Sequence, residues 1–345
     1  MKILIVKIGA IGDVIQTAAA VELFRQNYDV DCIDWACGKV VAPLVKGFGV
    51  ADRVFEVDER YLFGEKKRQL PYVLALMSKL ASLRDKYNRV IIPQYDWRYR
   101  LLVSLVRARK KITPGRSAGD RVVASQRNRV YSVYQLLGGG EKPSLDISEA
   151  LRTLGVRLLN RDIKLPSDLP DRFIALCPGG AQNLLRSDTL RRWPLVHYVE
   201  LAEKLIADGQ HVFLLGGPND TWVVKSFRDL PIQSLIGKTN LVQMAKVLSL
   251  ANAVVTHDSG PLHMTTMTDA GLVALFGPTP ANAVVPFGRP RTVVLREENK
   301  VACSPCYDGR DYAECSAPIC MQRISVKSVV DALRSVLVKS MESRG

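Results

Sequence analysis

The sequence has no hydrophobic run long enough to cross a membrane as a helix, which takes roughly 18 to 20 apolar residues. The longest candidate, Pro71 to Leu83, is interrupted by Lys79. The N-terminus also lacks the pattern of a secretion signal, because the charged residues Lys7 and Asp13 follow only a short apolar start. These absences predict a cytoplasmic protein whose thiols stay mostly reduced.

Three motifs that would identify common enzyme classes are also missing. The glycines after the first predicted strand (residues 2–8) have the spacing Gly-x-x-Gly-Asp, which is neither the dinucleotide fingerprint nor the Walker loop. Ser259 does not lie in the Gly-x-Ser-x-Gly elbow of a serine hydrolase. No Asp-x-Asp metal motif is evident, so no catalytic metal is expected. A dinucleotide oxidoreductase and a serine hydrolase are therefore disfavoured.

Acidic residues are scarce in one segment. Between Trp97 and Arg129 there are ten Lys or Arg residues and a single acid, Asp120. This segment therefore contributes +9 of the net charge of +14. Such a basic patch predicts an anionic partner: an acidic substrate, anionic lipid or nucleic acid. Nucleic acid is the weaker choice, because few aromatic residues are interleaved and no groove-reading motif accompanies the patch. A solvated helix face is the alternative.

The order of predicted elements indicates an α/β protein with two domains. At 345 residues the chain is long for one hydrophobic core. Predicted strands alternate with helices in both halves, which is typical of doubly wound parallel sheets. A helix is expected over residues 98–109 and a loop over 113–129. The domain boundary is placed near residue 165, and the last helix, within 326–345, is expected to pack back on the first domain.

The stretch from Ala253 to Thr279 carries polar residues at a sheet edge. A buried strand (253–257) is followed by Asp258-Ser259-Gly260-Pro261, a helix and a second buried strand (272–276). Ligands bind at the carboxyl ends of strands in open α/β sheets, and a helix N-terminus favours phosphate. The alternative is that Asp258 and Ser259 only cap the helix.

Motifs spread over nearly 300 residues resemble those of glycosyltransferase family 9, the ADP-heptose:lipopolysaccharide heptosyltransferases. In chain order they are Lys2-Ile-Leu-Ile-Val-Lys7, Gly12-Asp13-Val14-Ile15-Gln16-Thr17, Trp193-Pro194, Gly216-Gly217-Pro218, Asp258-Ser259-Gly260-x-x-His263, Phe276-Gly277-Pro278-Thr279 and Cys303-Ser-Pro-Cys306. Each motif is weak alone, but their order is specific. The resemblance implies a GT-B fold of two Rossmann-like domains facing a central cleft, with residues 1–165 binding the acceptor and residues 166–325 binding the nucleotide-sugar.

The same resemblance implies an inverting transfer of heptose from ADP-heptose to the inner core of lipopolysaccharide. Inversion needs a base that takes the proton of the acceptor hydroxyl, and Asp13 matches the family's presumed base. The helix N-terminus would favour its ionised form. An ordinary helix N-cap is the alternative for this residue.

The donor diphosphate requires positive charge and N–H donors. Where the family has a Lys two residues before Trp-Pro, this chain has Arg191, with Arg192 beside it; because Arg and Lys are not interchangeable, the donor can differ. Asp220 is placed to grip ribose hydroxyls, or to cap a helix, and His263 to reach a phosphate or sugar oxygen. The predicted donor-site residues are Gly179, Gly180, Arg191, Arg192, Asp220, Asp258, Ser259, Gly260 and His263.

The basic patch lies in the first half, where an acceptor bearing carboxylates and phosphates would need it. The predicted acceptor-site residues are Gly12, Arg98, Arg100, Arg116 and Arg127. The predicted partners are the ADP-sugar, the lipid A and inner-core acceptor, and the anionic surface of the inner membrane, with the protein peripheral to that membrane.

Four cysteines, Cys303, Cys306, Cys315 and Cys320, have the spacing C-x2-C-x8-C-x4-C. Four soft ligands in a reducing compartment fit a structural zinc site. Unligated thiols, or disulfides formed after purification, are the alternatives. No cofactor is expected to be required for catalysis.

Two other functions fit the sequence. One keeps the fold but changes the donor or acceptor, and the other is a non-catalytic protein that binds anionic lipid or nucleic acid through the basic patch. The change Asp13→Asn separates the classes, because it removes the base and leaves binding nearly intact.

Overall fold

A computed structural model describes residues 1–60, 66–82, 86–115, 127–140, 146–182, 188–297, 301–308 and 311–342. The chain divides into two compact units. Unit 1 is Met1–Leu158, and unit 2 comprises Leu159–Gln182 and Ser187–Gly345. The division falls between Leu158 and Leu159, a few residues before the boundary predicted near 165. The division coincides with the end of helix α8 (Ile147–Leu159), which continues past Gly155, where the predicted helix ends.

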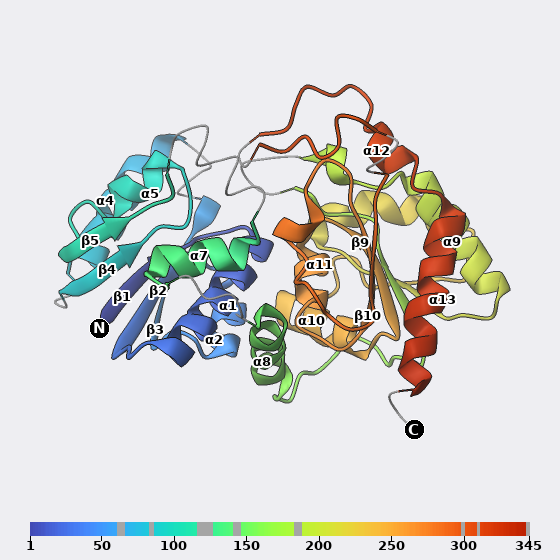
Figure 1. Ribbon diagram of the computed structural model, residues 1–345, viewed down its shortest axis with the longest axis horizontal. Helices are drawn as coiled ribbons and strands as arrows, with labels where there is room; N and C mark the ends of the chain where they lie inside the picture. The colour runs from blue at the N-terminus through green and yellow to red at the C-terminus, as the bar shows by residue number, and fades with distance from the viewer. Residues whose placement is uncertain are drawn as a thin grey trace. The chain divides into compact units, whose positions relative to one another are not determined.

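Unit 1 is built on a five-stranded parallel sheet in the order β3-β2-β1-β4-β5. Its strands, drawn in blue to cyan in Figure 1, are β1 (Lys2–Val6), β2 (Cys32–Gly38), β3 (Arg53–Val57), β4 (Tyr87–Ile91) and β5 (Ala108–Ile112). The central strand β1 is apolar from Ile3 to Val6 and buried on both faces, as expected for a strand covered by helices on each side.

Helices cover both faces of this sheet. They are α1 (Ile11–Asn27), α2 (Ala42–Phe48), α4 (Lys66–Ala81), α5 (Trp97–Leu102), α7 (Arg129–Leu137) and α8. Leu4 and Val6 of β1 pack in one cluster with buried residues of α4 and α5. Since side chains alternate along a strand, Ile3 and Ile5 face the other layer. Helices α1 and α7 pack together there, where Phe24 and Tyr134 make an edge-to-face contact with ring centroids 6.0 Å apart.

Two elements of unit 1 differ from the sequence prediction. The helix expected over 98–109 ends at Leu102, and residues 108–112 form the edge strand β5 instead. Pairing with β4 decides this, since the run Ala-Arg-Lys-Lys-Ile has no apolar period of its own. Helix α7 was not predicted, although it has recognisable ends. The Asn128 side chain accepts from the backbone N–H of Val130, and Gly138 closes the helix with a φ of 97°.

Unit 2 is built on a six-stranded parallel sheet in the order β11-β10-β9-β6-β7-β8. Its strands are β6 (Ile174–Cys177), β7 (Val212–Leu214), β8 (Gln233–Ser234), β9 (Ala253–His257), β10 (Gly271–Leu275) and β11 (Thr292–Leu295). The chain runs from β6 outward to β7 and β8, then returns to β9 on the other side of β6. The order therefore reverses between β6 and β9, the switch point at which open sheets bind ligands.

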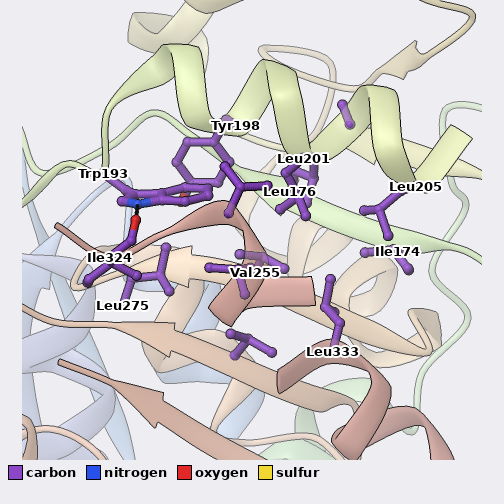
Figure 2. Packing of buried hydrophobic residues seen from close by; sticks show 14 of the residues in the cluster. Ile174, Leu176, Trp193, Tyr198, Leu201, Leu205, Val255, Leu275, Ile324 and Leu333 are labelled. Atoms are coloured by element: carbon purple, nitrogen blue, oxygen red, sulfur yellow. Dashed lines mark hydrogen bonds between the residues drawn. The ribbon is translucent and has the colours of Figure 1, made fainter. Parts of the chain in front are cut away.

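The helices of unit 2 include five α-helices and three short 3₁₀ segments among the described residues. They are η1 (Thr189–Arg191), α9 (Leu195–Ala207), η2 (Pro218–Phe227), α10 (Leu241–Leu250), α11 (Gly260–Thr265), η3 (Ala281–Ala283), α12 (Ile319–Gln322) and α13 (Val326–Glu342). Figure 2 shows their core, in which the Trp193 ring lies edge-on to Tyr198. The indole N–H of the buried Trp193 donates to the Ile324 carbonyl at 2.9 Å. This hydrogen bond joins the segment before α9 to the segment before α13.

The last helix, α13, packs on its own unit. Its buried residues Val329, Leu333 and Val336 join the core of the β6–β11 sheet, and it contacts β10, β11 and α9 (Figure 1). The sequence prediction placed this helix on the first domain; its apolar face is instead used within unit 2. No helix in the described ranges is both long and apolar enough to span a bilayer.

Candidate functional site

Asp13 lies in the first turn of α1, and it does not cap that helix. The N-cap position is Ala10, which has no side chain that can accept a hydrogen bond. Residues 7–10 connect the carboxyl end of β1 to the helix, and Gly12 is buried in its first turn, so Asp13 stands at the edge of the sheet. Its side chain is 38% exposed and therefore accessible to a ligand.

Two cations hold the Asp13 carboxylate. Lys7 Nζ lies 2.7 Å from Asp13 Oδ2, and Arg129 Nη1 lies 3.4 Å from Asp13 Oδ1. The Lys7 side chain is only 4% exposed, and its ammonium also donates to Gln94 Oε1 at 2.8 Å. These positive charges favour the ionised carboxylate, which is the form that a general base needs.

The predicted acceptor residues have different surroundings. Arg98 donates to Asp96, the N-cap of α5, through Nε at 3.0 Å. Arg100 is exposed, and Arg127 donates to Gln135 Oε1 at 3.3 Å. Arg116 lies outside the described residues.

The donor residues predicted in unit 2 gather at the carboxyl ends of β6, β7 and β9. Gly179 and Gly180 follow β6, Gly217 follows β7, and Asp258 follows β9. The loops after β6 and β9 touch: a Cβ built on Gly180 would lie 3.0 Å from Ser259 Cβ. Gly180 has a φ of 82°, which only glycine adopts without strain. The structure thus joins residues about 80 positions apart in the sequence.

Asp220 organises two of these loops. Its Oδ1 accepts from the backbone N–H of Gly180 at 2.7 Å, and its Oδ2 accepts from Gly217 at 2.8 Å. Its burial leaves little surface for ribose hydroxyls, so the observed role is closer to the predicted alternative, a cap, here of η2. The Gly180 amide, predicted as a phosphate donor, is occupied by this carboxylate.

Arg191 and Asp258 form a buried ion pair. Arg191 Nη1 lies 3.1 Å from Asp258 Oδ2, and Nη2 lies 3.3 Å from Asp188 Oδ2. Burial acts to lower the pKa of Arg191, but the charges of Asp258, Tyr312 and Asp188 outweigh it and raise the pKa. The guanidinium therefore stays charged. His263 Nε2 lies 3.8 Å from Asp258 Oδ1, close enough for an ion pair if the imidazole is protonated.

Arg192 holds the glycine loop. Its Nε and Nη2 both donate to the Gly180 carbonyl, at 2.9 and 2.7 Å. Its guanidinium carbon lies 5.0 Å from the centre of the Trp222 ring, a cation–π contact. Burial lowers the pKa of this arginine. The bonds of Arg192 thus shape the backbone next to Arg191.

Ser259 and Gly260 begin the short helix α11. Ser259 occupies the N-cap position, but its hydroxyl lies 3.2 Å from Thr256 Oγ1 and makes no cap hydrogen bond. Asp258 pairs with Arg191 instead of capping. The simple interpretation that both residues only cap the helix does not describe this turn.

His257, the last residue of β9, lies beneath the site. Its Nδ1 is 3.2 Å from the Tyr198 hydroxyl, and its Nε2 is buried with no hydrogen-bond partner among the described residues. Burial lowers the pKa of His257 to about 3, helped by Arg191 and Arg192. The imidazole is therefore neutral.

Tyr312 also borders the Arg191–Asp258 pair, and the sequence analysis did not identify it. Its hydroxyl lies 3.3 Å from Thr279 Oγ1, and its ring packs on Tyr307 with centroids 4.9 Å apart. Burial raises the pKa of Tyr312 to about 12, against the opposing effect of Arg191. Tyr312 lies within the four-cysteine segment, whose spacing points to metal ligands and not to this tyrosine. In the structure an isolated antiparallel bridge pairs it with Tyr307. Lys7 was not predicted as a site residue either, although it interrupts the apolar start of the chain.

The four clustered cysteines belong to the segment that carries Tyr312. The backbone N–H of Cys306 donates to Pro278 at 3.0 Å, which joins this segment to the turn after β10. Cys303 and Cys315 are exposed, whereas Cys320 is buried. Within the described part of the chain, no three His, Cys, Asp or Glu side chains are placed to hold one metal ion. The zinc site stays a prediction that this arrangement of thiols does not support.

Comparison with known proteins identifies relatives over most of the chain. The model of glycosyltransferase family 9 (heptosyltransferase) matches residues 80–315. Lipooligosaccharide heptosyltransferase 2 of Haemophilus influenzae is 28% identical over 323 residues, covering 87% of this chain and 90% of that protein.

Two solved structures share the fold. A family 9 glycosyl transferase from Veillonella parvula has a TM-score of 0.71 at 16% identity and covers 98% of this chain and 97% of its own. The E. coli heptosyltransferase WaaC with ADP has a TM-score of 0.70 at 18% identity, with coverage of 97% and 100%. The predicted α/β class with two parallel sheets is confirmed.

Proposed function

The chain belongs to glycosyltransferase family 9, and on that premise we propose that it transfers a heptose, with inversion, from ADP-heptose to the inner core of lipopolysaccharide. The observation that carries the proposal is the similarity to lipooligosaccharide heptosyltransferase 2, which extends over 87% of the chain. The likeness to WaaC, solved with ADP, supports ADP as the nucleotide of the donor.

Asp13 is the proposed base. Inverting transfer needs one carboxylate that takes the acceptor hydroxyl's proton as that oxygen attacks the anomeric carbon. Asp13 is accessible and ion-paired with Lys7 and Arg129, which supports a carboxylate that is ionised before the acceptor binds. The transferred proton would neutralise one partner of this network and weaken its hold on Lys7.

The Arg191–Asp258 region is the proposed diphosphate site. Arg191 is charged, and its Nε is buried with no hydrogen-bond partner among the described residues, so one donor stays available for a phosphate oxygen. Because Asp258 and Asp188 already offset its charge, a diphosphate must compete with them for the guanidinium. The arrangement favours the leaving group, whose charge grows as the glycosidic bond breaks.

The basic segment of unit 1 is the proposed acceptor region, with Arg98, Arg100, Arg116 and Arg127 as candidates for its phosphates and carboxylates. Because a lipid-linked acceptor is anchored in a membrane, the enzyme must reach it at the membrane surface. We therefore place the protein on the cytoplasmic side of the inner membrane, as a peripheral protein.

Catalysis without a metal is part of the proposal, because Arg191 supplies the positive charge that a cation would otherwise bring to the leaving group. Chelation with EDTA should leave the transfer rate unchanged. Metal analysis of the purified protein tests the cysteines separately: one zinc per chain would require Cys303, Cys306, Cys315 and Cys320 to rearrange around it.

Calorimetric titration with ADP, UDP, GDP and NAD is the first test. Selective ADP binding, weakened by Arg191→Ala and by Asp258→Ala, supports the proposed donor. Preference for UDP or GDP would agree with a glycosyltransferase but exclude ADP-heptose as its donor. This outcome is tested because the chain has Arg191 where the family has Lys. If no nucleotide binds, the catalytic proposal fails. The basic patch would then favour the alternative function, a non-catalytic protein that binds an anionic partner.

Transfer itself is tested with Asp13→Asn. Loss of a general base lowers rates by roughly 10² to 10⁴, while ADP affinity should be unchanged. Asp31→Asn, also on unit 1 and exposed, is the matched control and should retain full activity. Normal transfer by the Asp13→Asn variant would exclude Asp13 as the base.

A further inference from the structure

Helix α5 and the turn after it expose large apolar side chains on the outside of unit 1. Trp97 is 64% exposed, Leu101 is 43% exposed and Leu105 is 60% exposed. The inward residues of the same segment, Tyr99, Leu102 and Val106, are buried in the core. A surface helix normally places polar residues on its outer face. This segment is apolar on both faces, so its outer face is suited to a partner.

Trp97, Leu101 and Leu105 form an exposed apolar stripe that begins on α5 and continues into the turn after it. Trp97 and Leu101 are four residues apart on α5, so their side chains are neighbours on one helix face. The turn through Ser104 continues to Leu105. Lys111 Nζ donates to the Ser104 carbonyl at 2.7 Å, which brings the edge strand β5 against this turn.

Exposed cations lie close to the stripe in the sequence. Arg100 and Arg107 lie in the same segment, and Arg109, Lys110 and Lys111 follow one another along β5. No acidic residue occurs between Trp97 and Gly115. A simpler explanation for lysines on an edge strand is that they prevent pairing with the strands of other molecules. That explanation does not account for the neighbouring exposed Trp97 and Leu105, which would promote association.

We infer that α5, its following turn and β5 form a docking surface for an anionic phospholipid bilayer. Trp97, Leu101 and Leu105 enter the interfacial layer, and the surrounding cations bind the lipid phosphates. Apolar anchors flanked by Lys and Arg are the pattern of interfacial membrane binding. Nucleic acid fits less well, because Leu101 and Leu105 offer no stacking surface for bases.

This inference rests on the proposed attachment to the membrane and names the residues responsible for it. It also separates two uses of the basic segment. The β5 cations are assigned to lipid, whereas Arg100 stays a candidate for the acceptor and Arg129 is bound to Asp13 at the edge of the sheet. Changes on the docking surface should therefore affect binding to vesicles, and transfer to a water-soluble acceptor should not depend on them.

Flotation of the full chain with lipid vesicles tests the surface. Wild type should bind vesicles of phosphatidylethanolamine with 30% phosphatidylglycerol, weakly bind phosphatidylcholine vesicles, and dissociate as salt is raised. Trp97→Ser combined with Leu105→Ser should weaken binding roughly tenfold or more, because two anchors are lost. Lys110→Glu with Lys111→Glu should weaken it by at least about tenfold. All four positions are exposed, so the variants should fold normally.

Matched controls lie on unit 2. Leu250→Ser, at 45% exposure, and Arg228→Glu, with a 79% exposed side chain, should leave vesicle binding unchanged. The tryptophan emission of wild type should also shift to shorter wavelength with anionic vesicles. Trp97→Phe should abolish the shift, because Trp35 and Trp193 are already buried and the 39% exposed Trp222 belongs to unit 2, outside the docking surface.

Three outcomes would overturn the inference. In the first, wild type fails to bind anionic vesicles. In the second, the surface variants bind vesicles as well as wild type does. In the third, the surface binds nucleic acid or a second copy of the chain but not vesicles. The Asp13→Asn variant keeps the tests apart, since it should bind vesicles normally even if the proposed transfer is wrong.

Discussion

Lys7 and Asp13 form an ion pair at the carboxyl end of β1, with Nζ and Oδ2 separated by 2.7 Å. The lysine is almost completely buried, whereas the aspartate is accessible. Removing an ammonium group from water is costly unless it is paired, and here Asp13 and Gln94 provide its partners. The pair thus holds the proposed base in one orientation while leaving it open to substrate.

The change Lys7→Met tests this positioning. Removing the cation makes the ionised carboxylate less favourable, so the acidic limb of the pH profile of kcat/KM should move to higher pH. We expect kcat at neutral pH to fall about tenfold or more, with ADP affinity unchanged. Lys46→Met removes an exposed ion pair of the same unit and should do neither. An unshifted profile would show that Lys7 only stabilises the fold.

Gly179→Ala should disrupt the donor site through Asp220. A Cβ at Gly179 would lie 2.3 Å from Asp220 Cγ, so the carboxylate must move and lose its bonds to the Gly180 and Gly217 amides. Each buried hydrogen bond left unmade costs about 1 to 3 kcal/mol. We expect weaker ADP binding and a free energy of unfolding lower by roughly 2 kcal/mol, measured by calorimetry and urea titration.

Gly217→Ala is the control for that prediction. Its Cβ would approach Asp220 Oδ2 only to 3.7 Å, an ordinary contact, and its φ of −78° suits alanine. Equal losses in the two variants would mean that the space beside Asp220 does not decide the geometry of the loops.

Tyr312→Phe should weaken ADP binding without unfolding the protein. The hydroxyl bonded to Thr279 fixes the ring beside Arg191, and one such bond contributes about 0.5 to 1.5 kcal/mol, which is roughly a two- to twelvefold change in Kd. The effect should shrink in an Arg191→Ala background, since the two residues act together. Tyr307→Phe, on the paired ring, is the control, and an equal loss there would argue against a specific role for the Tyr312 hydroxyl.

His257 should make the protein sensitive to acid. Its pKa is lowered to about 3 by burial, from an ordinary value of 6.5, so below pH 6.5 the unfolded chain binds a proton that the folded chain does not. Stability should therefore fall as pH drops through this window, by about 1.4 kcal/mol per pH unit from this group. Urea titrations at pH 7 and pH 5 measure the loss.

His257→Asn should be less stable than wild type at pH 7, because the contact with Tyr198 is weakened, yet it should lose less stability between pH 7 and pH 5. The exposed His211→Asn variant should follow wild type. A wild-type pH dependence that survives in His257→Asn would assign the acid sensitivity to other groups.

Short-range patterns determined much of the fold. Apolar runs predicted β9 at the observed residues, and they predicted β1 and β10 to within a few positions. Strand β5 could not be predicted in this way, because Arg109, Lys110 and Lys111 lie in a strand only through pairing with β4. Helix α7 has end signals at Asn128 and Gly138, so its limits are encoded locally.

The sequence by itself determined the two α/β units, the family and the residue types of the site, because strand periodicity and turn chemistry act over a few neighbouring residues. Only the tertiary structure decided how those residues are used. It gave the Asp220 carboxylate to two backbone amides, paired Asp258 with Arg191, and brought Tyr312 beside them. The Gly217 amide is local to Asp220, but the Gly180 amide lies 40 residues from Asp220, and Arg191 lies 67 residues from Asp258. These two long-range contacts depend on the packing of whole strands, which no local pattern encodes.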